Sequence, residues 1–506
     1  MLCSTRILAR PSCESRSPRC ALLSRRVRSR LQGRMLAPHT MHDPTPTPPV
    51  PSSFRELGLP PTVVANLDAL GYTVPTPIQA ASLPAALSGR DVMAQAKTGS
   101  GKTAAFGLSL LAQLHTEFRG TQALVLCPTR ELAEQVAGEI RRLAKSESNL
   151  KVLVLCGGAP IRPQLASLEH GAHVVVGTPG RVLDHLRRGS LSLEALRSLV
   201  LDEADRMLDM GFRDDMVQVA DACPWGRQTL LYSATWPEDV EVLGRKFLRD
   251  PVIVKLAEQH APAKLRQLWY RIEEGERFEA AGKLLEHHRP GRALAFCNTK
   301  ESCRSLLEAL RARSVTALAL HGDLDQKERD QVLVQFANRS VSVLVATDVA
   351  ARGLDIEQLE AVLNVEVSPD AETHVHRVGR TGRVDQEGLA LNLVGPRESF
   401  RVERIEALQG HACEWRPLTE LKRAGAPPLP PMATLMILGG RKEKIRAGDI
   451  LGALTAAGGV NGKQVGKIDI NDHAAYVAVE RSVAQAALER LRSAGIKGKS
   501  VKVHRL

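Results

Sequence analysis

Short apolar runs alternate with amphipathic stretches from residue 54 onward. Such runs are typical of strands that a parallel sheet buries on both faces, and the amphipathic stretches between them are typical of covering helices. The expected strands of a first series are 92–94, 123–127, 151–155, 173–176, 198–201 and 228–232, and the pattern ends near 251–256. Expected helices at 104–114 and 130–145 complete βα units. The pattern predicts an α/β lobe over residues 51–256.

A second βα series follows a polar hinge at 257–264. Its expected strands are 268–272, 293–296, 316–320, 341–346, 361–365 and 389–394. These runs predict a second α/β lobe over residues 265–400. A linker is expected over 401–432, because it contains the Pro-rich stretch 424–431.

The last part of the chain, residues 433–506, has a different order of elements. We expect strands at 434–438, 467–470, 474–479 and 499–503, and helices at 447–457 and 482–494. This βαββαβ order is the split arrangement that RNA-recognition motifs use. The predicted fold is therefore two tandem parallel-sheet lobes of the α/β class, followed by a small α+β domain.

Residues 1–50 form a basic leader that ends in a Pro-rich stretch. They lack the continuous apolar segment of a secretory signal. An organellar transit peptide fits their Arg- and Ser-rich composition. The alternative, which we prefer, is sequence upstream of the true start, with Met35 or Met41 as the first residue. The leader is expected to be disordered.

The net charge of +12 over 506 residues is concentrated at the two ends. Residues 1–50 hold nine arginines against two acids, and residues 433–506 hold thirteen Lys and Arg against six acids, so each segment carries +7. The residues between them carry −2. This distribution favours a polyanionic partner bound outside the central lobes, although basic ends can also serve solubility alone.

Neither a membrane span nor a metal-binding cysteine motif is predicted. We find no apolar run near the ~18 residues of a spanning helix. The nine cysteines are scattered without a CxxC pair, so they predict neither zinc ligation nor a disulfide framework. We expect a cytoplasmic protein.

A glycine-rich segment, Gly99-Ser100-Gly101-Lys102-Thr103, lies between the first expected strand and its helix. In this context glycines let backbone N–H groups turn toward a phosphate. Lys102 is then placed for the β- and γ-phosphates and the Thr103 hydroxyl for Mg²⁺. Ala96 departs from the glycine that usually begins such a loop. The sequence predicts binding of a nucleoside triphosphate.

Two acids, Asp202 and Glu203, follow an apolar strand at the sheet edge where ligands bind in open α/β folds. Mg²⁺ bound to nucleotide phosphates is commonly held by one or two carboxylates. We therefore expect Asp202 to bind the Mg²⁺ ion, directly or through water. Glu203 is placed to orient and deprotonate an attacking water. An acidic helix cap is the alternative for these residues taken alone.

Arginine recurs every three residues in the second lobe, at Arg377, Arg380 and Arg383. This spacing is expected to place the three guanidinium groups along one face of a turn or helix. Solvated surface or nucleic-acid contact is the ordinary role of such a run. Phosphoryl transfer also needs a cation on the γ-phosphate, so the run predicts an arginine finger from the second lobe.

Together these motifs resemble the ordered series of the DEAD-box RNA helicases. In the first lobe the matching segments are Phe54 with PTPIQ at 75–79, the phosphate loop, PTRELA at 128–133, GG at 157–158, TPGR at 178–181, DEAD at 202–205 and SAT at 233–235. In the second lobe they are FCN at 296–298, QKER at 326–329, ATD at 346–348, RGLD at 352–355 and HRVGRTGR at 376–383. The resemblance implies two RecA-like lobes and an RNA-stimulated ATPase that unwinds short duplexes.

The resemblance also assigns roles to single residues. It implies that Gln79 selects ATP, and that alanine is the family's own residue at the start of the loop. The nucleotide contacts that it implies are Phe54, Gln79, Ala96, Lys97, Thr98, Gly99, Ser100, Gly101, Lys102, Thr103 and Asp355. It implies γ-phosphate contacts by Arg380 and Arg383, and a link between the acidic motifs through His376. It implies RNA contacts by Pro128, Thr129, Arg130, Gly158, Thr178, Arg181, Arg329 and Thr347. It implies coupling of hydrolysis to strand separation by Ser233, Thr235 and Asp205. His374 departs from the aromatic residue common there.

The third domain indicates which kind of RNA the protein binds. Its central strands contain one aromatic residue, Tyr476, so base stacking on the sheet is poorly supported. Basic residues instead cluster in loops and strand ends, and the predicted RNA contacts among them are Arg441, Lys442, Lys444, Lys467, Lys497 and Lys499. The segments 439–444, 449–454, 465–470 and 496–499 resemble the C-terminal domain of the DbpA subfamily of bacterial helicases. That resemblance implies a tether to a 23S rRNA hairpin near the peptidyl-transferase centre and a role in late 50S subunit assembly. A nonspecific basic RNA anchor is the alternative.

Two other functions remain open from the residues. One is a non-catalytic RNA-binding factor that uses ATP only as a conformational ligand. Intact Lys102, Asp202, Glu203 and Arg380 argue against it, because a binder has no need for all four. The other is a DNA helicase. We expect a monomer that requires ATP and Mg²⁺.

Overall fold

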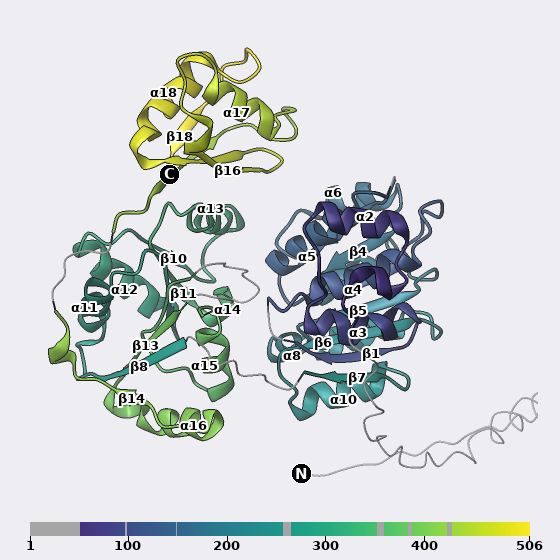
Figure 1. Ribbon diagram of the computed structural model, residues 1–506, viewed down its shortest axis with the longest axis horizontal. Helices are drawn as coiled ribbons and strands as arrows, with labels where there is room; N and C mark the ends of the chain where they lie inside the picture. The colour runs from purple at the N-terminus through teal and green to yellow at the C-terminus, as the bar shows by residue number, and fades with distance from the viewer. Residues whose placement is uncertain are drawn as a thin grey trace, which may run out of the picture. The chain divides into compact units, whose positions relative to one another are not determined.

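The computed structural model describes residues 51–96, 99–147, 149–256, 265–351, 359–382, 387–422 and 428–506. These residues form two seven-stranded sheets and one four-stranded sheet. Figure 1 shows helices on both faces of each large sheet. The predicted class, two parallel-sheet lobes and a small α+β domain, is confirmed. The predictions for the leader and for the hinge at 257–264 lie outside the described residues.

The first lobe has a parallel sheet of order β3-β4-β2-β5-β6-β1-β7. Its strands are β1 (Val92–Gln95), β2 (Ala123–Leu126), β3 (Val152–Leu155), β4 (Val174–Gly177), β5 (Ser198–Asp202), β6 (Gln228–Ser233) and β7 (Val252–Lys255). Its helices are η1 (Phe54–Leu57), α2 (Pro61–Ala69), α3 (Pro77–Leu87), α4 (Lys102–Gln113), α5 (Arg130–Leu143), α6 (Ile161–Leu168), α7 (Pro179–Arg187), α8 (Ala204–Asp209), α9 (Arg213–Asp221) and α10 (Glu238–Phe247). Two apolar clusters cover the sheet, one on each face.

The second lobe has a parallel sheet of order β10-β11-β9-β12-β13-β8-β14. Its strands are β8 (Leu265–Arg271), β9 (Ala293–Cys297), β10 (Ala317–Leu320), β11 (Val343–Thr347), β12 (Ala361–Asn364), β13 (Gly388–Val394) and β14 (Glu414–Trp415). Its helices are α11 (Arg277–His288), α12 (Lys300–Ala312), α13 (Gln326–Ala337), α14 (Asp348–Ala351), α15 (Ala371–Val378), η2 (Pro396–Glu398), α16 (Ser399–Gln409) and η3 (Leu418–Glu420).

The third domain has an antiparallel sheet of order β16-β17-β15-β18. Its elements are β15 (Met432–Ile437), α17 (Ala447–Thr455), η4 (Gly462–Gln464), β16 (Val465–Ile470), β17 (Ala475–Glu480), η5 (Arg481–Val483), α18 (Ala484–Ala494) and β18 (Val503–Arg505). The two helices pack on one face of the sheet, where apolar residues of β15 and β17 form the core.

Two predicted boundaries are wrong. The second lobe does not end at residue 400, because α16 spans that position and β14 pairs with β8 as an edge strand of the same sheet. The last strand does not begin at residue 499. Lys497 and Gly498 have φ angles of +52° and +70°, so residues 496–499 form a tight turn and the strand starts at Val503.

Candidate active site

The phosphate loop leaves β1 and enters α4 through two glycines in the left-handed region, Gly99 at φ +82° and Gly101 at φ +91°. At Gly101 a Cβ atom would lie 2.6 Å from Gln79 Nε2, so no larger residue fits without moving that side chain. Ala96 is buried and donates its N–H to the Ser233 carbonyl at 2.8 Å. Lys97 and Thr98, predicted nucleotide contacts, lie outside the described residues.

Helix α3 holds the other side of this loop. Thr76 Oγ1 donates to the Ser100 carbonyl at 2.8 Å, and Gln79 Nε2 donates to the Gly101 carbonyl at 3.0 Å. Gln79 Oε1 accepts the Thr76 N–H at 2.9 Å. The sequence assigned no role to Thr76 itself, although a Thr three residues before a Gln is a helix-start signature. The adenine contact of Gln79 stays a prediction.

Phe54, predicted to contact the nucleotide, is buried in an apolar cluster of the first lobe. Its ring meets that of Tyr72 edge-on, with 6.1 Å between centroids. Its nucleotide contact also stays a prediction.

Lys102 and the two acids at the end of β5 form a buried charge cluster. Lys102 Nζ lies 3.1 Å from Asp202 Oδ1 and 3.6 Å from Glu203 Oε1, and the three side chains are at most 5% exposed. Burial alone would lower the pKa of Lys102, but the facing carboxylates outweigh it and raise the pKa. Lys102 is therefore a fixed cation beneath the loop, close to the acids predicted to act on a triphosphate.

The donors for Mg²⁺ are hard oxygens, as this ion requires. Asp202 Oδ2 is buried and has no hydrogen-bond partner among the described residues. Thr103 is in the first turn of α4, next to Lys102. The same part of the chain contains no cluster of three His, Cys, Asp or Glu side chains that could hold a metal ion. A carboxylate and a hydroxyl are donors that fit a nucleotide-bound Mg²⁺.

Glu203 has a left-handed backbone, with φ +56°, directly before α8. Its second carboxylate oxygen lies 3.2 Å from Arg206 Nη1. This backbone conformation is uncommon for a residue with a side chain and is often found at functional sites. Arg206 was not among the predicted site residues, although its i,i+3 spacing from Glu203 was a usable signal.

The three predicted coupling residues meet. Asp205 Oδ2 accepts the N–H and the hydroxyl of Thr235, both at 2.9 Å. The Asp205 N–H donates to Ser233 Oγ at 3.2 Å. The end of β6 is thus bonded to the residue two positions after Glu203. A shift at the acids can reach residues 233–235 through these bonds.

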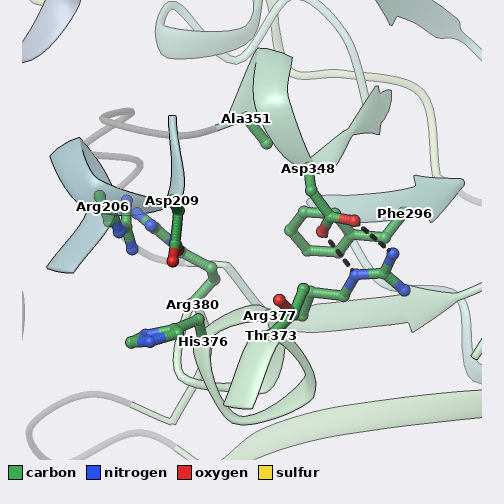
Figure 2. Close-up of a pocket in the computed structure, with 9 residues that line it drawn as sticks. All are labelled: Arg206, Asp209, Phe296, Asp348, Ala351, Thr373, His376, Arg377 and Arg380. Atoms are coloured by element: carbon green, nitrogen blue, oxygen red, sulfur yellow. Dashed lines mark hydrogen bonds and ion pairs between the residues drawn. The ribbon is translucent and has the colours of Figure 1, made fainter. Parts of the chain in front are cut away.

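In the second lobe the arginine run does not line one face, as the spacing had predicted. Helix α15 ends at Val378, before Gly379, so Arg377 and Arg380 point different ways. Figure 2 shows Arg377 facing Asp348, while Arg380 and His376 lie on the side of Arg206 and Asp209. Arg383 and Asp355 lie outside the described residues.

Arg377, the first arginine of the predicted run, is a structural residue; the resemblance had implied γ-phosphate contacts only for Arg380 and Arg383. It is 1% exposed and makes two bonds to Asp348, at 2.6 and 2.7 Å. Its guanidinium also donates to Asn298 Oδ1 at 2.7 Å and to the Glu366 carbonyl at 2.8 Å. The Arg377 guanidinium thereby bonds helix α14 and the segments that follow β9 and β12 to helix α15.

Arg380 and His376 face the first lobe's residues in a small pocket that Arg206 and Asp209 also line. Arg380 is 6% exposed. Burial, and then the neighbouring Arg206, lowers the pKa of His376. The pocket places a second-lobe arginine beside the helix that follows Glu203. Its contact with the γ-phosphate stays a prediction.

His374 packs inside the second lobe against Trp269, with ring centroids 5.1 Å apart and nearly parallel. Its Nε2 lies 3.1 Å from Gln267 Oε1. Burial, and then the Arg377 charge, lowers the pKa of His374 to about 3. The imidazole is therefore neutral in the folded chain and supplies the flat ring that an aromatic residue would supply.

This neutral histidine predicts a pH-dependent stability. Its folded pKa lies below the value of about 6.5 expected in the unfolded chain, so its contribution is complete above pH 6.5. As the pH falls below 6.5 the unfolded chain binds the proton, and stability falls by up to about 1.4 kcal/mol per pH unit. Replacing His374 with Phe should flatten the fall in melting temperature between pH 7 and pH 5. His473→Phe, at an exposed site, is the control; equal slopes in all three proteins would contradict the prediction.

The predicted RNA residues of the first lobe share one half of the sheet edge. Pro128 and Thr129 follow β2, Gly158 follows β3, and Thr178 follows β4, and these strands are neighbours. The acids, the 233–235 segment and the phosphate loop follow β5, β6 and β1 on the other half. Parallel strands end at the same edge, so one edge carries both predicted sites.

Arg181 orders the half of this edge that carries the predicted RNA residues. Its Nη1 donates to the Ala159 carbonyl at 3.1 Å and to Gln164 Oε1 at 2.9 Å. Gln164 in turn donates to the Cys156 carbonyl at 3.2 Å. Arg130 is partly exposed at the start of α5. The RNA contacts of these residues stay predictions.

In the second lobe, Thr347 ends β11, and Arg329 lies on α13. Arg329 Nη2 donates to the Ala350 carbonyl at 2.8 Å, and its Nε pairs with the Glu131 carboxylate of the first lobe. Arg329 is thus engaged by protein in this structure, and its RNA contact stays a prediction.

Five of the six third-domain residues predicted to contact RNA lie on two adjoining turns. We call Arg441, Lys442, Lys444, Lys497 and Lys499 the basic loop surface; all five are exposed. Lys497 Nζ donates to the Lys444 carbonyl at 2.9 Å, which holds the two turns together. Lys467 lies elsewhere, in β16, paired with Asp469 at 3.1 Å.

Family comparisons agree with this geometry. Residues 76–243 match the DEAD/DEAH box helicase family, 276–385 match the helicase conserved C-terminal domain, and 434–505 match the DbpA RNA binding domain. No helix among the described residues is long and apolar enough to cross a membrane.

Individual relatives cover most of the chain. The ATP-dependent RNA helicase DbpA of Escherichia coli is 50% identical over 449 residues, which are 88% of this chain and 98% of that protein. The DEAD-box ATP-dependent RNA helicase CshA of Bacillus cereus is 42% identical over 70% of this chain and 68% of that protein. Among solved structures, Saccharomyces cerevisiae Dbp5 bound to RNA and ADP BeF3 matches 73% of this chain and 96% of that chain, with 31% identity and a TM-score of 0.67. The chain belongs to the DEAD-box family of ATP-dependent RNA helicases and, within it, to the DbpA type with its RNA-binding domain.

Proposed function

We propose that this helicase is tethered to a 23S rRNA hairpin and opens short duplexes beside it during assembly of the 50S ribosomal subunit. It would act as a cytoplasmic monomer. The observation that carries the proposal is the basic loop surface, which offers five exposed cations on two adjoining turns within the DbpA-type domain. Phosphate contacts of this kind give affinity and make it dependent on salt.

In the proposed hydrolysis, Glu203 accepts a proton from the water that attacks the γ-phosphorus of ATP. The bond to the β–γ bridging oxygen breaks, and ADP leaves with that electron pair. Lys102 lies 3.1 Å from Asp202 and supplies a fixed positive charge under the loop. Arg380 would add a second charge from the other lobe. When bound, Mg²⁺ would be held by Thr103 and Asp202 and would neutralise charge on the phosphates.

Coupling to RNA would pass through Asp205. Its bonds to Thr235 join the acid segment to residues 233–235. We propose that loss of the γ-phosphate shifts the acids and, through these bonds, the RNA half of the edge. Closed lobes would bend one strand of a duplex and expel its partner, and product release would reopen them.

The test is ATPase activity against a panel of RNAs: a 23S rRNA fragment with the hairpin, the same fragment with the hairpin scrambled, an unrelated duplex and a DNA duplex. We expect half-maximal stimulation at a concentration at least tenfold lower for the hairpin fragment. Equal stimulation by the scrambled fragment would mean that the third domain binds RNA without preference for the hairpin.

The basic loop surface should decide this preference. Substituting Arg441, Lys442 and Lys499 with alanine should weaken hairpin binding. The slope of log affinity against log salt should fall by about 0.7–0.9 for each phosphate that the variant no longer neutralises. Binding is measured by fluorescence anisotropy at salt concentrations from about 50 to about 200 mM, a range over which such contacts change affinity steeply.

A matched control removes three exposed cations from the second lobe, through Lys283→Ala, Arg311→Ala and Arg397→Ala. It changes the net charge equally and should leave the salt slope unchanged. An identical loss in both triple variants would show that only total charge matters.

A further inference from the structure

Three neighbouring strands of the first lobe, β6, β1 and β7, end in register at the edge that carries the phosphate loop (Figure 1). Gln95, the last residue of β1, lies opposite Ser233 at the end of β6 and opposite Lys255 at the end of β7. Each strand leads to a different segment. The phosphate loop follows Gln95, residues 234 and 235 follow Ser233, and the hinge predicted at 257–264 begins two residues after Lys255.

Side chains join these three strand ends. Gln95 Nε2 donates to the Ala234 carbonyl at 3.3 Å. Lys255 Nζ lies over the ring of Trp236, 4.2 Å from the ring centroid. Because β1 separates β6 from β7, this contact spans the strand that leads to the phosphate loop. The end of β7 is therefore attached to the segment that follows β6, although these two strands are not paired.

Apolar packing and the lysine hold the Trp236 ring. The ring is partly buried against the apolar cluster that includes Met93, Val240 and Leu243. Its Nε1 is buried and has no hydrogen-bond partner among the residues that the structure describes. A buried indole N–H usually has such a partner, which fixes the orientation of the ring. Within the described part of the chain, the cation over the face is therefore the polar contact that orients Trp236.

The residue before Trp236 is bonded to the acidic segment. Asp205 Oδ2 accepts the N–H and the hydroxyl of Thr235, both at 2.9 Å. Glu203, the proposed base, lies two residues before Asp205. A continuous series of contacts thus leads from the acids through Thr235 and Trp236 to Lys255.

Lys255 lies where a displacement of this segment can reach the rest of the chain. Strand β7 is an edge strand of the sheet and pairs with β1. Lys255 is its last residue, and the chain leaves the first lobe's sheet after it. The Trp236 contact is therefore an attachment of the strand end in addition to the sheet hydrogen bonds.

We infer that Trp236 and Lys255 are positioning residues that couple ATP hydrolysis to strand separation. A shift of the acids moves the 233–235 segment, the Trp236 ring moves with it, and the ring displaces Lys255 and the chain that leaves for the second lobe. This step rests on the proposed coupling through Asp205 and extends it to the end of β7. Breaking the contact should separate hydrolysis from unwinding.

Lys255→Met tests this in the full chain, because methionine keeps a long side chain and removes the charge over the ring. The measured quantity is the number of duplexes opened per ATP hydrolysed, on a short duplex beside the hairpin fragment. We expect RNA-stimulated hydrolysis within threefold of wild type and a fall of at least fivefold in duplexes opened per ATP. Lys255→Arg should restore the ratio to within twofold of wild type, since a guanidinium also binds the face of a tryptophan ring.

Lys246→Met, at an exposed site on α10 of the same lobe, is the matched control and should keep the wild-type ratio. Trp236→Leu should lower the ratio as Lys255→Met does, and the double variant should lower it no further, because both changes remove one contact. An unchanged ratio in Lys255→Met would overturn the inference. So would a parallel fall of hydrolysis and unwinding, or a failure of Lys255→Arg to restore the ratio.

Thr235→Val separates a failure of this inference from a failure of the proposed coupling. The change removes the hydroxyl that donates to Asp205 at 2.9 Å. A fall in duplexes opened per ATP in Thr235→Val but not in Lys255→Met would mean that coupling does not pass through Lys255, and only the inference would be wrong. A wild-type ratio in both variants would contradict the inference and the proposed coupling together.

Discussion

Replacing Glu203 with glutamine should lower the rate of ATP hydrolysis by about two to four orders of magnitude, because the amide cannot accept the proton of the attacking water. The change keeps the size of a side chain that is 1% exposed. Lys102 retains its pairing with Asp202 at 3.1 Å, so the phosphate loop should remain intact. ATP and RNA should therefore still bind, while steady-state hydrolysis and unwinding collapse.

Three measurements separate this result from misfolding. Affinity for a fluorescent ATP analogue should change by less than threefold, and the melting temperature by only a few degrees. Glu194→Gln, an exposed acid in the same lobe, should behave as wild type. Normal turnover in Glu203→Gln would show that Glu203 is not the base that accepts the proton of the attacking water. Loss of ATP binding would instead assign it to the binding of nucleotide.

Replacing Arg377 with alanine should destabilise the second lobe by about 3–5 kcal/mol, the usual cost of removing one partner from a buried ion pair. The side chain is 1% exposed and bonds to Asp348, Asn298 and the Glu366 carbonyl. Asp348 would keep its charge without the partner that compensates it. Denaturant unfolding of the second lobe should measure the change.

Arg377→Lys should recover only part of this loss, since an ammonium group cannot make the same set of planar bonds. Arg397→Ala is the matched control, because its side chain is 88% exposed and its pairing with Glu274, at 3.6 Å, is solvated. It should change stability by less than about 0.5 kcal/mol. An Arg377→Ala protein as stable as Arg397→Ala would show that the buried network contributes nothing.

The residues of the site were predictable where chemistry restricts residue type and order. The glycines, Lys102 and the acids after β5 are required by a phosphate loop and its metal, and they lie together as expected. The arginine run was predicted less well. Its period of three suggested equivalent roles, but Gly379 follows the end of α15, and Arg377 turns inward while Arg380 lines the pocket.

Local conformation also decided the boundaries that pattern reading missed. Residues 499–503 were predicted as a strand, yet positive φ angles at Lys497 and Gly498 turn the chain just before them, and the strand begins only at Val503. Residues after 400 read as linker because β14 has only two residues, too few to form a pattern. It is a strand only because β8 offers it an edge to pair with.

The sequence by itself determined the two parallel-sheet lobes, the small α+β domain and the chemistry of the nucleotide site. These follow from apolar periodicity and from residue types that phosphate and metal binding restrict, both of which are local properties of a chain. The tertiary structure alone decided which groups the Arg377 guanidinium bonds to, and where the outer face of the C-terminal sheet is buried. Thr434 and Ser340 are 94 positions apart, and no local pattern distinguishes a hydroxyl that meets solvent from one that meets another domain.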